Sequence, residues 1–147
     1  MLATTDDIDY LVPNNGSLGT SWTTVGFNAA ASGFTTSANG IGYENSPGSS
    51  TSYTGEINTP LPSGTTTAYV RSEFNLANAS EVVDLSLALT YDDGFAVYLN
   101  GTYLFGENEP AAPLVYNSAA QAGRSDATVL DSPVTFALND HLNLLQN

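Results

Sequence analysis

The sequence predicts an all-β protein built as an antiparallel β-sandwich, and three observations lead to this prediction. The chain has 147 residues, a length that suits one domain over residues 1–147 with a core of its own. Only 12% of the residues are charged, and the polar residues are mostly Ser, Thr, Asn and Gly, so strand and turn formers outnumber helix formers. The clearest hydrophobic pattern repeats every two residues, which is typical of strands.

The first half of the chain contains short apolar islands between turn-forming residues. Residues 22–27 alternate loosely and predict either a short strand or an anchored loop. Residues 28–68 are dominated by Gly, Ser, Thr, Ala and Asn. Because a compact domain rarely holds so long a structureless stretch, we expect one or two short strands there, with a surface loop around residues 45–52.

The second half contains the best-defined strands. Alternating apolar residues predict five of them, over residues 69–76, 82–91, 95–99, 102–105 and 134–138. Asn100-Gly101 predicts a two-residue type I′ turn, because both central positions of that turn need a positive φ. Asn139 is expected to cap a short helical turn over residues 140–145. Several large aromatic side chains are expected in the core, namely Trp22, Phe74, Tyr91, Phe95 and Phe136.

Charge and composition exclude several classes of function. The net charge is −13 and the only basic residues are Arg71 and Arg124, so we predict no nucleic-acid partner. No apolar run is long enough for a membrane span, and an acidic surface is repelled by anionic lipids, so no membrane insertion is expected. The chain has no cysteine, and His141 is its only histidine, with no nucleophile that the pattern pairs with it. We therefore predict that the chain is not an enzyme.

Asp92 and Asp93 are the candidate metal ligands. They precede Gly94 at the end of a predicted strand, and carboxylates with nearby backbone carbonyls are the ligands that Ca²⁺ prefers, so Ca²⁺ is the expected cofactor. The alternative is a tight corner in which one aspartate closes an Asx turn and Gly94 supplies a positive φ. Asp6, Asp7 and Asp9 form a second acidic cluster, either a cation site or a solvated tail.

Three tyrosines are the candidate sugar-binding residues. Tyr43, Tyr53 and Tyr116 lie in or beside predicted loops, where an exposed ring can stack on the apolar face of a sugar. Arg71 lies within a predicted strand, where a bidentate salt bridge to a carboxylate is the plain expectation.

The segment 91–101, Tyr-Asp-Asp-Gly-Phe-Ala-Val-Tyr-Leu-Asn-Gly, resembles the galactose-binding-like jelly-roll modules of multidomain secreted bacterial proteins. Other segments agree in order, so that the resemblance spans nearly the whole chain: 11–13, 22–27, 40–43, 69–74, 78–82 and 138–145. The resemblance implies a jelly-roll β-sandwich in a secreted or cell-surface protein. It also implies a non-catalytic carbohydrate-binding role.

The resemblance further implies roles for individual residues. In such sandwiches an arginine on the concave face, here Arg71, can grip sugar hydroxyls. In the similar PA14-type lectin modules, paired aspartates such as Asp92 and Asp93 hold a calcium ion that binds sugar hydroxyls. The sequence departs from the family after Leu144-Leu145, where members continue with a further strand. This departure predicts either a fragment or a strand supplied by another copy or a neighbouring domain.

Two principal hypotheses of function follow. The first is a non-catalytic carbohydrate-binding or adhesion module whose partner is a polysaccharide or another glycan. The alternative is a structural or assembly domain, a spacer or filament subunit completed by strand exchange. A third hypothesis, a glycoside hydrolase, depends only on the fact that fifteen acidic residues permit a catalytic carboxylate pair.

Overall fold

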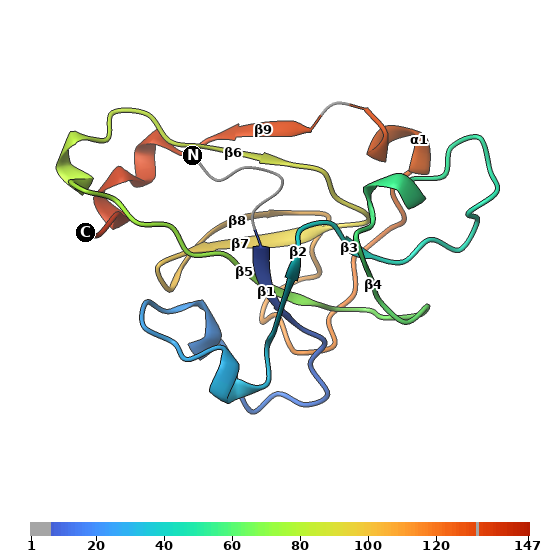
Figure 1. The fold of residues 1–147 in the computed structure, drawn as a ribbon, viewed down its shortest axis with the longest axis horizontal. Helices are drawn as coiled ribbons and strands as arrows, with labels where there is room; N and C mark the ends of the chain where they lie inside the picture. The colour runs from blue at the N-terminus through green and yellow to red at the C-terminus, as the bar shows by residue number, and fades with distance from the viewer. Residues whose placement is uncertain (1–6, 132) are drawn as a thin grey trace.

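Short strands dominate the computed structural model, which describes residues 7–131 and 133–147 (Figure 1). This confirms the all-β prediction. The strands of these residues are β1 (Asp7–Leu11), β2 (Thr35–Ala38), β3 (Ile41–Gly42), β4 (Thr59–Pro60), β5 (Tyr69–Arg71), β6 (Ser86–Leu89), β7 (Phe95–Leu99), β8 (Thr102–Glu107) and β9 (Val134–Ala137). The helical elements are α1 (Asp126–Val129) and 3₁₀ turns at Ser21–Thr23, Ala30–Ser32, Thr54–Glu56, Ala79–Glu81 and Asn139–Leu144.

The strands pair in four small sheets. β1 lies between β2 and β5, with both pairings antiparallel, while β6 pairs with β9 and β7 with β8, again antiparallel. The short strands β3 and β4 are parallel. β1, β6 and their partners come from distant parts of the chain, so these ladders depend on long-range contacts rather than on hairpin turns.

The predicted strands are found, but several are shorter than the pattern suggested. The strand expected over 69–76 ends at Arg71, and the one expected over 82–91 is reduced to β6. Residues 22–27 form no strand; the chain makes a 3₁₀ turn at Ser21–Thr23, so the anchored-loop alternative applies. The predicted terminal helical turn is a 3₁₀ turn over Asn139–Leu144, but the prediction that Asn139 caps it is wrong, because Leu138 is the N-cap and Asn139 Oδ1 accepts a hydrogen bond from the backbone N–H of Leu85.

Phe74 was predicted to be a core residue, and this is wrong. Its side chain is 42% exposed. β5 ends three residues earlier, at Arg71, so no neighbouring strand fixes which way Phe74 points, and sequence alternation alone does not bury it.

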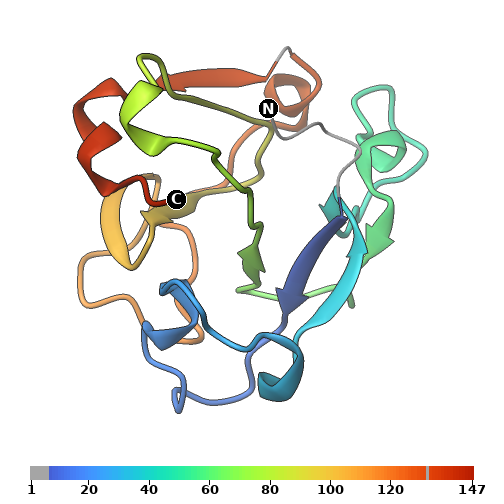
Figure 2. The same cartoon turned by 60° about the vertical axis from the view of Figure 1, so that its left-hand side comes forward.

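The β7–β8 hairpin matches its prediction most closely. Asn100 has φ 49° and Gly101 has φ 87°, which agrees with the expected type I′ turn. Tyr98 pairs with Tyr103, whereas Val97 pairs with Phe105, so Leu104 is an extra residue that forms a bulge. The C-terminal turn lies against this hairpin (Figure 2), where Asn100 Nδ2 donates a hydrogen bond of 2.8 Å to the carbonyl of Leu144.

Two aromatic clusters lie on either side of the hairpin. The first joins it to the β6–β9 pair: the Phe95 ring is 4.6 Å from Tyr91 and 5.6 Å from Phe136, measured between centroids. The second joins it to the β1–β2–β5 sheet, because Trp22 stacks on Tyr69 at 4.4 Å and meets Tyr98 edge-on at 6.1 Å. These contacts place Tyr91, Phe95, Phe136 and Trp22 in the packed interior, as expected.

The turn at Gly101 provides a test of this arrangement. The Gly101→Ala variant adds a Cβ to a residue with a left-handed backbone conformation, and this atom would lie 3.3 Å from Thr24 Cγ2. We therefore expect urea denaturation to show a loss of about 1–2 kcal/mol of unfolding free energy. Gly48→Ala is the control, because Gly48 has no positive φ and open space around its Cβ position. Equal stability of the two variants would contradict the turn geometry.

Candidate functional site

The site lies where the loop of residues 43–53 meets residues 91–94, which form the corner that precedes β7. The Tyr53 hydroxyl hydrogen-bonds to Asp92 Oδ2 at 2.7 Å and to the carbonyl of Tyr43 at 3.3 Å. The Glu44 carboxylate shapes the loop from within, since it accepts hydrogen bonds from the backbone N–H groups of Ser46 and Tyr53. The loop therefore folds around one carboxylate and is attached through Tyr53 to another.

Asp93 is held from the opposite side by the segment that leads into α1. Its Oδ1 accepts a hydrogen bond of 2.7 Å from the backbone N–H of Arg124. The Arg124 guanidinium donates to the carbonyls of Tyr91 and Thr128, and its carbon lies 4.2 Å from the centre of the Tyr91 ring. Arg124 thus holds residues 91–93 in place through both its backbone N–H and its guanidinium group. The peptide bond between Asp92 and Asp93 is cis.

Gly94 has a different role from the one that the turn alternative predicted. Its φ is not positive, so that part of the prediction is wrong. A Cβ at this position would lie 2.7 Å from the carbonyl oxygen of Glu107 and 2.9 Å from that of Asn108. Glycine is therefore required by the close approach of the chain that follows β8.

Negative charge accumulates at this corner. Desolvation is the main cause that raises the pKa of Asp92, and the charges of Asp93 and Asp126 raise it further, while the hydrogen bond from Tyr53 opposes them. The pKa of Tyr53 is raised as well, chiefly by burial and then by its hydrogen bond to Asp92. Among the described residues, no ion pair joins Arg124 to these carboxylates. A bound cation would therefore relieve the repulsion.

The donor set for such a cation is incomplete within the chain. The described residues contain no group of three or more acidic, histidine or cysteine side chains placed to hold a metal ion. Asp92 and Asp93 would supply two carboxylates. Because Ca²⁺ takes six to eight oxygen ligands, its remaining positions would be filled by backbone carbonyls, water or the hydroxyls of a ligand.

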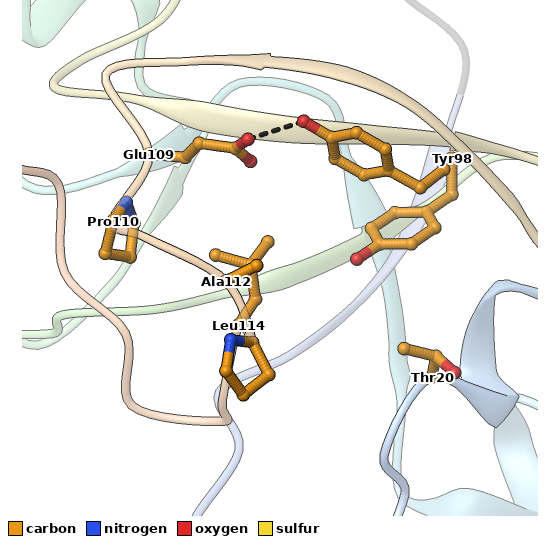
Figure 3. A pocket seen from close by; sticks show the side chains of 8 residues that line it. Thr20, Tyr98, Glu109, Pro110, Ala112 and Leu114 are labelled. Carbon is orange, nitrogen blue, oxygen red and sulfur yellow. Dashed lines mark hydrogen bonds between the residues drawn. The ribbon is translucent and has the colours of Figure 1, made fainter.

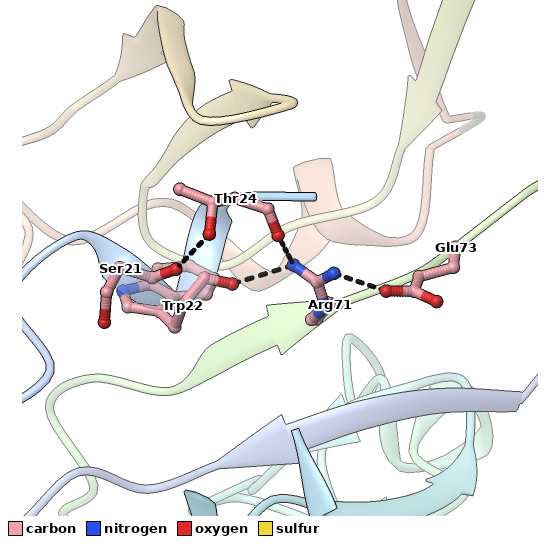
Figure 4. Close-up of polar contacts among 5 residues, drawn as sticks. All are labelled: Ser21, Trp22, Thr24, Arg71 and Glu73. Atoms are coloured by element: carbon pink, nitrogen blue, oxygen red, sulfur yellow. Dashed lines mark hydrogen bonds and ion pairs between the residues drawn. The ribbon is translucent and has the colours of Figure 1, made fainter. Parts of the chain in front are cut away.

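Arg71 lies elsewhere and is engaged within the fold (Figure 4). Its guanidinium donates to the carbonyls of Trp22 at 2.8 Å and Thr24 at 3.0 Å, and it forms an ion pair with Glu73. The side chain is only 9% exposed, and its Nε has no hydrogen-bond partner. The ion pair involves one oxygen of Glu73 and is not the bidentate bridge that was expected; the other hydrogen bonds of the guanidinium go to backbone carbonyls.

The remaining predicted residues are also separate from this corner. Tyr116 packs against the buried cluster of Ala29, Phe34 and Tyr69, which leaves its ring half-buried. Asp6 lies outside the described residues; its neighbour Asp9 lies in β1 and accepts a hydrogen bond of 2.6 Å from Thr36 Oγ1. From the predicted set, the structure thus joins the side chains of Tyr53 and Asp92, next to which Asp93 lies in the sequence, while Tyr43 takes part through its backbone carbonyl.

A second convergence of polar groups was not predicted. A pocket of about 340 Å³ lies beside the β7–β8 hairpin (Figure 3). Tyr98 and Tyr103 line it together with Glu109 and with apolar residues of the 110–114 segment. The hairpin register pairs the two tyrosines and could have suggested them; no sequence signal marks Glu109.

Comparison of the chain with protein-family models, with curated proteins and with solved structures returns no significant match. Within the described residues, every helix is too short to cross a membrane.

The raised pKa of Asp92 yields a pH-dependent prediction. A folded-state pKa above the unfolded one means that ionisation of Asp92 costs stability as the pH rises through its titration. Asp92→Asn should therefore increase the unfolding free energy relative to the wild type at neutral pH, with the difference declining toward zero in acid. Asp84→Asn, an exposed change of the same charge, is the control in parallel urea titrations. A pH-independent difference would contradict the prediction.

Proposed function

We propose that this chain is a non-catalytic carbohydrate-binding or adhesion module of a secreted or cell-surface protein. One observation carries the proposal: the hydroxyl of Tyr53, a residue predicted to stack on sugars, hydrogen-bonds to Asp92, which is predicted to hold Ca²⁺, and to the backbone carbonyl of Tyr43. These features were inferred from separate parts of the sequence, and Tyr53 lies 39 residues before Asp92.

The proposed site binds a glycan through a calcium ion. Asp92 and Asp93 would hold the ion at the corner before β7, and neighbouring sugar hydroxyls would complete its coordination. Tyr43 and Tyr53 are half-buried, and their rings would contact the apolar face of the sugar. Binding of the ion supplies the positive charge that this acidic corner otherwise lacks.

A jelly-roll arrangement is the finer fold that we propose. β1 pairs with both β2 and β5, and β6 pairs with β9, so strands far apart in the sequence become neighbours. Such long-range antiparallel pairing is a feature of Greek-key and jelly-roll sandwiches. The two aromatic clusters on either side of the β7–β8 hairpin agree with this proposal.

The absence of catalysis and of a nucleic-acid partner is part of the same proposal. Both guanidinium groups of the chain donate hydrogen bonds to backbone carbonyls, Arg71 near the Ser21–Thr23 turn and Arg124 near α1. This engagement leaves little basic surface for phosphates, in agreement with the net charge of −13.

Calcium and glycan titrations test the proposed site. We expect Ca²⁺ to bind by isothermal titration calorimetry, and a glycan array to detect a ligand only when Ca²⁺ is present. Asp92→Asn and Asp93→Asn should each weaken Ca²⁺ binding at least roughly tenfold, since each removes one of two carboxylate ligands.

Asp84→Asn serves as the control for this experiment, because it removes the same charge from an exposed position. Tyr43→Ala, which removes one proposed stacking ring and keeps the backbone carbonyl that Tyr53 contacts, should reduce glycan binding more than Ca²⁺ binding. Glycan binding that persists in a chelator, or Ca²⁺ binding equally affected by Asp84→Asn and Asp92→Asn, would rule out the site.

A structural or assembly role is the second candidate, and the sheet edges favour it. In the described residues, β6–β9 and β7–β8 are two-stranded pairs, so each presents edges without a further ladder partner. Such edges accept a strand from a second copy or a neighbouring domain.

Size-exclusion chromatography with light scattering, over a range of concentrations, tests this role. An assembly completed by strand exchange should appear as oligomers that resist dilution, and as filaments in electron microscopy. A monomer at every concentration that still binds a glycan would exclude the assembly role and leave the carbohydrate-binding proposal intact.

A further inference from the structure

The pocket beside the β7–β8 hairpin is defined by the hairpin register. Tyr98 on β7 and Tyr103 on β8 are cross-strand partners, and their ring centroids lie 5.5 Å apart with an interplanar angle of 74°. The 109–114 segment closes the opposite side with two prolines, an alanine and a leucine (Figure 3). A pocket of about 340 Å³ lies in the range of small-molecule sites and can hold a sugar residue.

The polar groups of the pocket converge on Glu109. Tyr103 donates its hydroxyl hydrogen to Glu109 Oε1, and this bond raises the pKa of Tyr103 to about 12. The other carboxylate oxygen, Oε2, is buried and has no hydrogen-bond partner. Tyr98 is also held in its protonated form, because burial and then the charge of Glu109 raise its pKa.

The charges around the pocket select the chemistry of its ligand. No basic side chain lines it, and within the described part of the chain Glu109 forms no ion pair. A carboxylate left without a counter-charge in a partly desolvated place is costly, and a cationic group compensates for it. The faces of two tyrosine rings attract a cation as well. A carboxylate-bearing or phosphate-bearing ligand would be repelled.

The hydroxyl groups of the pocket favour a sugar over a simple amine. The Tyr98 hydroxyl forms no hydrogen bond among the described residues and can donate to a ligand oxygen. The Tyr103 hydroxyl, whose hydrogen is directed at Glu109, retains lone pairs that accept from a ligand hydroxyl. The prolines and Leu114 offer an apolar wall for a ring face.

We propose that this pocket binds an unacetylated amino sugar, with its ammonium group beside Glu109 and its ring between the tyrosines and the 110–114 segment. The sugar part of the ligand rests on the carbohydrate-binding function proposed above, whereas the cationic part rests on Glu109 alone. The pocket is lined by none of the residues of the Asp92–Asp93 corner, so its binding requires no Ca²⁺.

The test is calorimetric titration of the full chain, in a chelator and at mildly acidic pH, with the β-1,4-linked disaccharide of glucosamine. We expect binding at least roughly tenfold tighter than that of the N-acetylated disaccharide, which has no positive charge. Cyclohexylamine, which carries the ammonium group without sugar hydroxyls, should also bind at least roughly tenfold more weakly.

Matched variants separate the pocket from the general attraction of an acidic protein for cations. Glu109→Gln and Tyr98→Phe should weaken disaccharide binding, whereas Glu107→Gln, an exposed change of the same charge on β8, should leave it unchanged. Circular dichroism melting confirms that each variant is folded, and Tyr103→Phe replaces Glu109→Gln if that variant unfolds. Asp92→Asn should have no effect on this titration, which distinguishes the pocket from the calcium site.

Three outcomes would overturn the proposal. Equal affinity for the N-acetylated disaccharide would remove the role of the ammonium group, and equal affinity for cyclohexylamine would remove the role of the sugar. Equal losses in Glu109→Gln and Glu107→Gln would show attraction by net charge only. Failure of the calcium-dependent glycan titration, with disaccharide binding intact, would refute the calcium site and leave the pocket in place.

Discussion

The register of the β7–β8 hairpin is the constraint on which the rest of the structure depends. The Asn100-Gly101 turn fixes the pairing of Tyr98 with Tyr103, and the bulge at Leu104 then shifts Phe105 opposite Val97. Because successive side chains in a strand point to opposite faces, Phe95 and Tyr98 lie on different sides of the hairpin. One side therefore meets the β6–β9 pair and the other meets Trp22, so that a slip of one residue would disrupt both aromatic clusters.

These clusters bury little side-chain surface completely, so polar contacts between loops are important for holding the fold together. Among the described residues, no side chain falls below 2% exposure. Arg71 compensates by joining β5 to the carbonyls of Trp22 and Thr24, and Arg124 joins the carbonyl of Tyr91, before β7, to that of Thr128 in α1. In a chain with a net charge of −13, both basic residues are thus used to hold loops in place.

This use of the arginines explains the electrostatics of both proposed sites. The carboxylates of Asp92, Asp93 and Glu109 lie among tyrosines and backbone carbonyls, with no cationic side chain paired to them in the described residues. Partial desolvation makes uncompensated charge costly, and the raised pKa of Asp92 reflects that cost. This is why we propose a positively charged ligand for each site, a metal ion at one and an organic cation at the other.

The sequence by itself determined the features that depend on neighbouring residues. Two-residue alternation located β6, β7, β8 and β9, and the positive φ values of Asn100 and Gly101 follow from the turn type that those residues allow. Alternation could not show where a strand stops pairing, so Phe74 was wrongly placed in the core. Only the tertiary structure decided which loops meet. It brought Tyr53 to Asp92 across 39 residues and attached Glu109 to Tyr103, because such contacts depend on the packing of whole segments, which no local pattern encodes.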